Sequence, residues 1–149
     1  MKKLIHFVHQ AQEARLALTA NMESRFSDLV TAGKAGEYPH LVEQFKALYD
    51  ACDATLETLA TRLAAAAGGK AASKIVTSIV LEERSRGDAH LKVQVMRQHK
   101  SVAGAAGEAG VASTAEALAM VEANEKAHIV SISELQDELR AEAADLDEE

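Results

Sequence analysis

Apolar residues recur every three or four positions through the first part of the chain. The repeating set is Leu4, Phe7, Ala11, Ala14, Leu18, Met22, Phe26 and Leu29. This spacing is the period of one face of an α-helix. We therefore predict a helix over residues 3–30, which ends where residues 31–37 supply two glycines.

A second stripe of the same period predicts a helix over residues 38–67. Its members are Leu41, Phe45, Leu48, Cys52, Leu56, Leu59 and Leu63. Pro39 suits the first helical turn, where its missing N–H has no partner to lose. Gly68 and Gly69 follow the stripe and predict the end of the helix.

The third predicted helix, over residues 72–99, changes character in its middle. It is apolar at both ends, but no face of the segment EERSRGDAH, residues 82–90, is wholly apolar. Gly87 lies within this segment and costs about 1 kcal/mol relative to alanine in a helix interior. A break at Gly87, leaving three helices and an extended arm, is therefore the alternative to a continuous helix.

The fourth predicted helix, over residues 113–143, is the most clearly marked. Small residues over 100–112 indicate a linker, and the Ser113-x-x-Glu116 spacing is that of a capping box. Two polar residues, Glu125 and His128, lie where the apolar stripe should continue. Residues 144–149 are mostly acidic and follow a helix C-terminus, where the helix dipole disfavours them, so we expect this tail to fray.

Four amphipathic helices joined by short connections predict an all-α, antiparallel up-down-up-down four-helix bundle. Aromatic residues make up only 3% of the chain and proline occurs once, which argues against a sheet. The length of 149 residues suggests one domain, which we place at residues 1–143.

The charge and composition of the chain limit the partners and the cellular compartment that we expect. The net charge is −7 and no stretch of the chain is strongly basic, so we expect no nucleic-acid partner. The single cysteine, Cys52, excludes an internal disulfide and fits a reducing compartment. No segment is long and apolar enough to span a membrane, and we expect a cytoplasmic protein.

The midpoints of the four predicted helices should lie at similar heights in such a bundle. That layer could collect the polar residues Asp53, Glu82 or Glu83, Arg86, Glu125 and His128. Carboxylates and imidazoles that meet in a bundle interior can bind a metal ion, and the candidate ligands are Glu83, His90, Glu125 and His128. The same side chains can instead form a network of ion pairs and hydrogen bonds.

The motif Glu125-Lys-Ala-His128, followed by a leucine-bearing amphipathic run, resembles the Glu-x-x-His of the fourth helix in ferritin-like di-iron proteins. That resemblance implies iron or another transition metal as the cofactor. It also implies a second Glu-x-x-His on the second helix, where this chain has Asp50, Cys52 and Asp53 instead.

We therefore expect a non-catalytic helical interaction or assembly protein without a cofactor, acting as a homo-oligomer or on a helical protein partner. The alternative is a modified ferritin-like protein that binds metal between its third and fourth helices. A third possibility is an amphipathic bundle that opens onto a lipid surface, although the chain lacks the Lys- and Arg-rich polar face that such helices carry.

Overall fold

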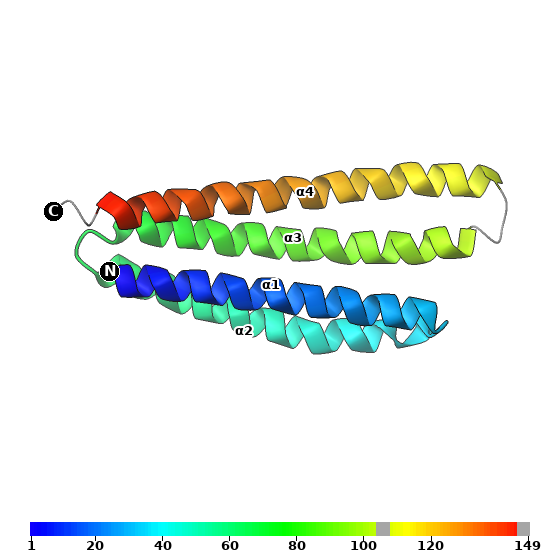
Figure 1. Ribbon diagram of the computed structural model, residues 1–149, viewed down its shortest axis with the longest axis horizontal. Helices are drawn as coiled ribbons and strands as arrows, with labels where there is room; N and C mark the ends of the chain where they lie inside the picture. The colour runs from blue at the N-terminus through cyan, green and yellow to red at the C-terminus, as the bar shows by residue number, and fades with distance from the viewer. Residues whose placement is uncertain (104–107, 146–149) are drawn as a thin grey trace. The chain divides into compact units, whose positions relative to one another are not determined.

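A computed structural model describes the backbone of residues 1–103 and 108–145, and the side chains of residues 1–100 and 114–145. Four long α-helices and one short 3-10 turn make up these residues, which include no strand (Figure 1). The helices are α1 (Lys2–Thr31), α2 (Tyr38–Ala65), α3 (Lys70–Ala103) and α4 (Glu108–Asp145), and the 3-10 turn η1 is Ala35–Glu37. The predicted all-α, four-helix class is confirmed.

The chain divides into two compact units, which are treated separately below. Unit 1 comprises Met1–Leu81 and Glu134–Glu149, and unit 2 comprises Glu82–Ser133. The single domain of residues 1–143 stays a prediction.

All four helices contribute to the hydrophobic core of unit 1. Its fully enclosed members include Ile5 and Val8 of α1, Leu56 and Leu63 of α2, Ala72 and Val76 of α3, and Leu139 of α4. The first turns of α1 and α3 thus meet the last turns of α2 and α4. Neighbouring helices must therefore run in opposite directions, as the up-down-up-down prediction requires. Burying each large aliphatic side chain contributes roughly 1.5–3 kcal/mol.

In the first half of α1 the buried face differs from the predicted stripe by about one residue, whereas Met22 and Phe26 are buried as predicted. Phe7 is 38% exposed, whereas the neighbouring Val8 is completely buried. The same rotation places two polar residues, Gln12 and Arg15, on the buried face. The prediction followed the largest apolar residues. The observed orientation also depends on an ion pair between Arg15 and Asp53 of α2.

The turn between α2 and α3 depends on its two glycines, as predicted. Gly68 has φ +72°, a conformation that side-chain-bearing residues rarely adopt. A Cβ atom at Gly69 would lie 2.1 Å from the backbone oxygen of Leu63. The Ser73 hydroxyl donates a hydrogen bond of 2.8 Å to the backbone oxygen of Ala60, which ties the start of α3 to the end of α2.

The second half of the chain corrects three boundary predictions. α3 continues through Gly87, so the alternative of a break there is wrong. α4 begins at Glu108, which places Ser113 inside the helix and makes the predicted cap and the long linker wrong. Alanine is frequent in this segment and is the best helix former, so it extends both helices. The tail is helical to Asp145, and the predicted fraying of residues 146–149 lies outside the described residues.

Candidate functional site: polar contacts between helices

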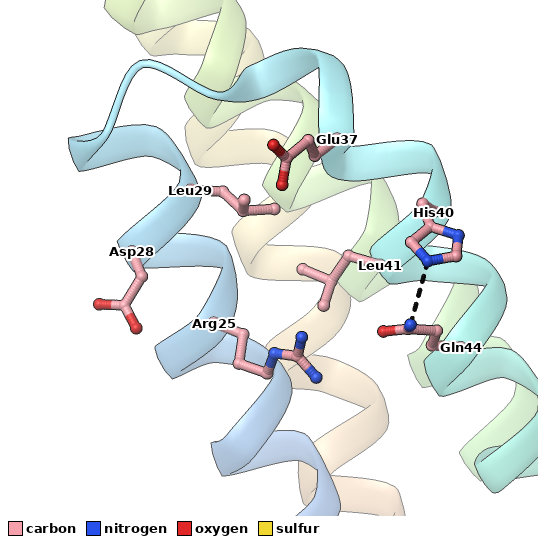
Figure 2. A pocket seen from close by; sticks show the side chains of 7 residues that line it. All are labelled: Arg25, Asp28, Leu29, Glu37, His40, Leu41 and Gln44. Carbon is pink, nitrogen blue, oxygen red and sulfur yellow. Dashed lines mark hydrogen bonds between the residues drawn. The ribbon is translucent and has the colours of Figure 1, made fainter.

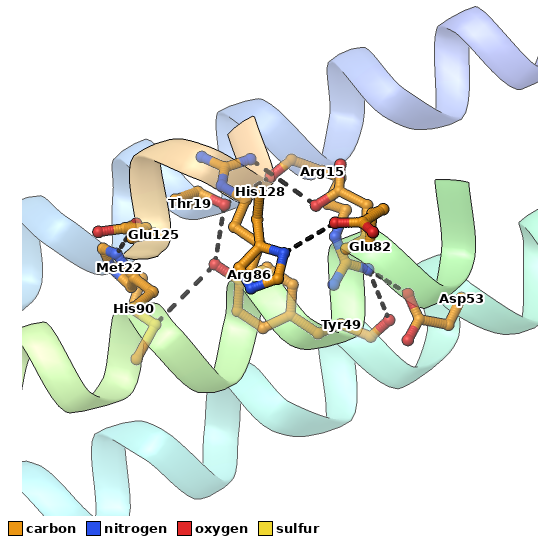
Figure 3. A network of polar contacts seen from close by, with 11 residues as sticks. Arg15, Thr19, Met22, Tyr49, Asp53, Glu82, Arg86, His90, Glu125 and His128 are labelled. Carbon is orange, nitrogen blue, oxygen red and sulfur yellow. Dashed lines mark hydrogen bonds and ion pairs between the residues drawn. The ribbon is translucent and has the colours of Figure 1, made fainter. Parts of the chain in front are cut away.

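An ion pair in the interior of unit 1 joins α1 to α2. The Arg15 guanidinium contacts the Asp53 carboxylate, and the two side chains are only 4% and 7% exposed (Figure 3). Nη1 of Arg15 also lies 3.5 Å from the backbone oxygen of Tyr49, and the guanidinium lies over the Tyr49 ring at 4.9 Å. Arg15 is therefore held by a carboxylate, a carbonyl and an aromatic face together.

The hydroxyl of Tyr49 extends this network along α1. It donates to Oγ1 of Thr19 at 3.0 Å, and Thr19 in turn donates to the backbone oxygen of Arg15 at 3.1 Å. The sulfur of Met22 lies 3.9 Å from the same hydroxyl. These contacts fix the register of α1 against α2 at the level where the apolar stripe of α1 is interrupted.

Two histidine–glutamate pairs join α3 to α4 in unit 2. Nδ1 of His90 donates to Oε1 of Glu125, and Nδ1 of His128 donates to Oε2 of Glu82, each at 2.7 Å (Figure 3). Arg97 and Glu122 form a third, half-exposed pair at 3.5 Å. We call these three pairs the α3–α4 ladder. From one pair to the next, the residue number rises along α3 and falls along α4. The two helices are therefore antiparallel here as well.

Both ring nitrogens of His90 are engaged. While Nδ1 donates to Glu125, Nε2 lies 3.1 Å from Nε2 of Gln94, which can donate to it. A metal ion could bind His90 only after one of these two hydrogen bonds was broken.

Several positive charges act on Glu125. Burial raises the pKa of the Glu125 carboxyl, but the hydrogen bond from His90 and the charges of His90, Arg86 and Arg97 lower it by more, so the net pKa lies below its ordinary value. Glu125 is therefore a carboxylate at neutral pH, which suits its role as the acceptor of the His90 bond.

The predicted metal ligands do not come together as a group of four. His90 and Glu125 meet, but His128 pairs with Glu82, and Glu83 lies 3.7 Å from Arg86. In the part of the chain with described side chains, no three His, Cys, Asp or Glu residues gather in a way that could hold a metal ion. Metal binding by these residues stays a prediction, and the ferritin-like resemblance gains no support.

Sequence reasoning placed Asp53, Glu82, Glu125 and His128 in one polar layer but missed Arg15. The signal was present, because Arg15 falls three residues after Gln12 and seven after Val8, on one helix face. An arginine on an otherwise apolar face needs a buried acidic partner, and Asp53 is the acidic residue on the facing stripe of α2.

A hollow of about 420 Å³ lies on the surface of unit 1 where the end of α1 meets the start of α2 (Figure 2). Its lining residues are Arg25, Asp28, Leu29, Glu37, His40, Leu41 and Gln44. His40 is hydrogen-bonded to Gln44 at 3.1 Å. The walls carry charges of both signs, a positive one from Arg25 and negative ones from Asp28 and Glu37.

None of the described helices has both the length and the apolar character needed to cross a membrane. The predicted cytoplasmic location stays a prediction. Comparison with curated proteins and with solved structures gives no significant match.

A family model described as DNA repair REX1-B matches residues 3–97. This finding overturns the prediction that nucleic acid has no part among the partners of this chain. That prediction used the net charge of the whole chain, which does not reveal how charges are grouped on the folded surface. The predicted homo-oligomer or helical protein partner gains no support from the comparisons. Because the matched residues make up more than half of the chain, the protein belongs to the DNA repair REX1-B family.

Proposed function

We propose that this protein is a non-catalytic helical component of DNA repair that acts by binding other macromolecules through its outer surface. Its membership of the DNA repair REX1-B family supports a role in DNA repair. The observation that carries the non-catalytic part is that Arg15 bonds to Asp53, and His90 to Glu125, inside the protein. A helical protein with such an interior has its functional groups on the outside.

The interior contacts explain why these residues are poor candidates for catalysis. A general base or a nucleophile needs an atom that can reach a substrate. Arg15 and Asp53 are nearly inaccessible to solvent, and both nitrogens of His90 already have hydrogen-bonding partners. Their evident physical role is to fix which helix faces meet, since a buried polar group is costly unless its partner is correctly placed.

The outer surface offers apolar side chains that a partner could cover. Leu16, Leu81 and Met120 are 61%, 58% and 71% exposed. Covering one such side chain completely contributes roughly 1.5–3 kcal/mol to the free energy of binding. These positions are the first to test for loss of binding.

Complementation of cells that lack the protein tests this function. The double variant Arg15→Met/Asp53→Leu removes the interior ion pair while keeping apolar bulk. The control, Lys46→Met/Asp50→Leu, makes a matched change at two exposed positions of α2. We expect both variants, at wild-type abundance and helicity, to restore survival after DNA damage.

Two results would overturn the proposal. One is that cells lacking the protein survive DNA damage as well as normal cells. The other is that the interior variant, although folded and abundant, fails to restore survival while the control succeeds. That second outcome would show that the interior polar groups do more than hold helices together.

A further inference from the structure

Exposed basic residues from three separate segments gather at one end of unit 1. They are Lys2 and Lys3 in the first turn of α1, Arg62 in the last turn of α2, and Lys70 and Lys74 at the start of α3. We call these five residues the basic end. They are separated by up to 72 positions in the sequence, so no local stretch of the chain is basic.

The core contacts bring these segments together. The side chain of Met1 lies against the α2–α3 turn, 3.2 Å and 3.6 Å from where Cβ atoms on Gly69 and Gly68 would be. Ile5, Leu63 and Ala72 belong to the same buried cluster. Each basic residue lies within a turn or two of one of these contacts, so all five must share this end of unit 1.

Three of the basic side chains at this end are not neutralised by ion pairs with any described residue. Within the part of the chain whose side chains are described, Arg62, Lys70 and Lys74 form no ion pair. The first turns of α1 and α3 contain no acidic residue. The partial positive charge of these two N-termini is offset by the partial negative charge of the α2 and α4 C-termini at the same end, so the attraction comes from the side chains. Opposing them at this end are Glu142 and Asp145 of α4, because Ala143 packs against the same core.

We propose that the basic end binds the phosphate backbone of DNA. Five exposed cations grouped on one surface attract a polyanion even when the whole chain is acidic, because charges more than about 10 Å away are screened at physiological salt. An acidic protein segment would be attracted by the same charges, and the family's connection with DNA repair favours DNA. The proposed function does not require such contact, so this inference goes beyond it.

Fluorescence anisotropy with a short labelled DNA duplex tests the proposal. About four phosphate contacts predict that affinity falls roughly 100-fold between about 50 and 200 mM salt. The variant Lys3→Glu/Lys70→Glu/Lys74→Glu should bind at least about tenfold more weakly, and its salt slope should be smaller by about 3. It should remain folded, because acidic residues are favourable at helix N-termini.

The control variant Lys46→Glu/Lys92→Glu/Lys126→Glu makes the same change in net charge at exposed positions outside the basic end. It should bind the duplex within about twofold of wild type at physiological salt, because distant charges are screened. Equal weakening of both variants would overturn the proposal, as would absence of duplex binding at about 50 mM salt. Binding to polyglutamate in preference to DNA would overturn it too. None of these results would alter the survival of cells that carry the interior variant, so the two proposals fail independently.

Discussion

Removing one partner of the ion pair between Arg15 and Asp53 should destabilise the protein strongly, whereas replacing both partners by apolar residues should not. The variant Asp53→Leu leaves the Arg15 guanidinium 4% exposed without its carboxylate. The Tyr49 carbonyl at 3.5 Å and the Tyr49 ring also contact the guanidinium but carry no negative charge to replace the carboxylate. Loss of one partner of a buried pair costs about 3–5 kcal/mol. That is a large part of a total stability of about 5–15 kcal/mol.

Replacing both partners should recover most of the loss. In Arg15→Met/Asp53→Leu no charge remains buried, so the free energy of unfolding should lie within about 2 kcal/mol of wild type. Urea unfolding followed by far-UV circular dichroism measures all three variants of this double-mutant cycle, including Arg15→Met alone. The reasoning would be refuted if Asp53→Leu cost less than about 1 kcal/mol, or if the double variant were as unstable as the sum of the single ones.

Three smaller changes test other parts of the structure. Gly87→Ala should raise the free energy of unfolding by about 0.5–1 kcal/mol, because the added methyl group meets no atom within 4 Å; a lower melting temperature would contradict this. Gly69→Ala should destabilise the protein by more than that amount, because its Cβ would lie 2.1 Å from the Leu63 oxygen; wild-type stability would show that the turn can relax. Glu125→Gln should cost about 1.5–3 kcal/mol at neutral pH. Because the pKa of Glu125 is lowered in the folded protein, its contribution is complete above the ordinary value of 4.5 and is lost as the pH falls through the folded value. A difference from wild type that stays constant across that range in urea titrations would refute this assignment.

The helix class and the interruption of the α3 stripe could both be predicted from the sequence. Helical period locates the elements, because each helix must bury one continuous face. Along α3 the face that carries Val76 and Ile79 continues into Glu83 and His90, so the change from apolar to polar is visible in the residues themselves. The helix ends between residues 100 and 112 were harder, because Gly104, Gly107 and Gly110 indicate a linker while the alanines between them favour a helix.

The pairing of side chains could not be predicted, because it depends on rotations of a fraction of a turn. Glu82 and Glu83 are adjacent, and only the orientation of α3 decides that Glu82 meets His128 while Glu83 lies by Arg86. The basic end was missed for a similar reason. Lys3 and Lys70 are far apart in the sequence and come to the same end of unit 1 only when its core forms.

Our central proposal is that the histidine–glutamate pairs of the α3–α4 ladder act as structural bonds, and metal binding by them is the alternative. Elemental analysis of protein purified without an affinity tag tests it most directly, together with thermal unfolding before and after chelation. We predict far less than one metal ion per chain and an unchanged melting temperature. A stoichiometric metal ion that is lost in Glu125→Ala/His128→Ala would contradict the claim and establish the metal-binding alternative.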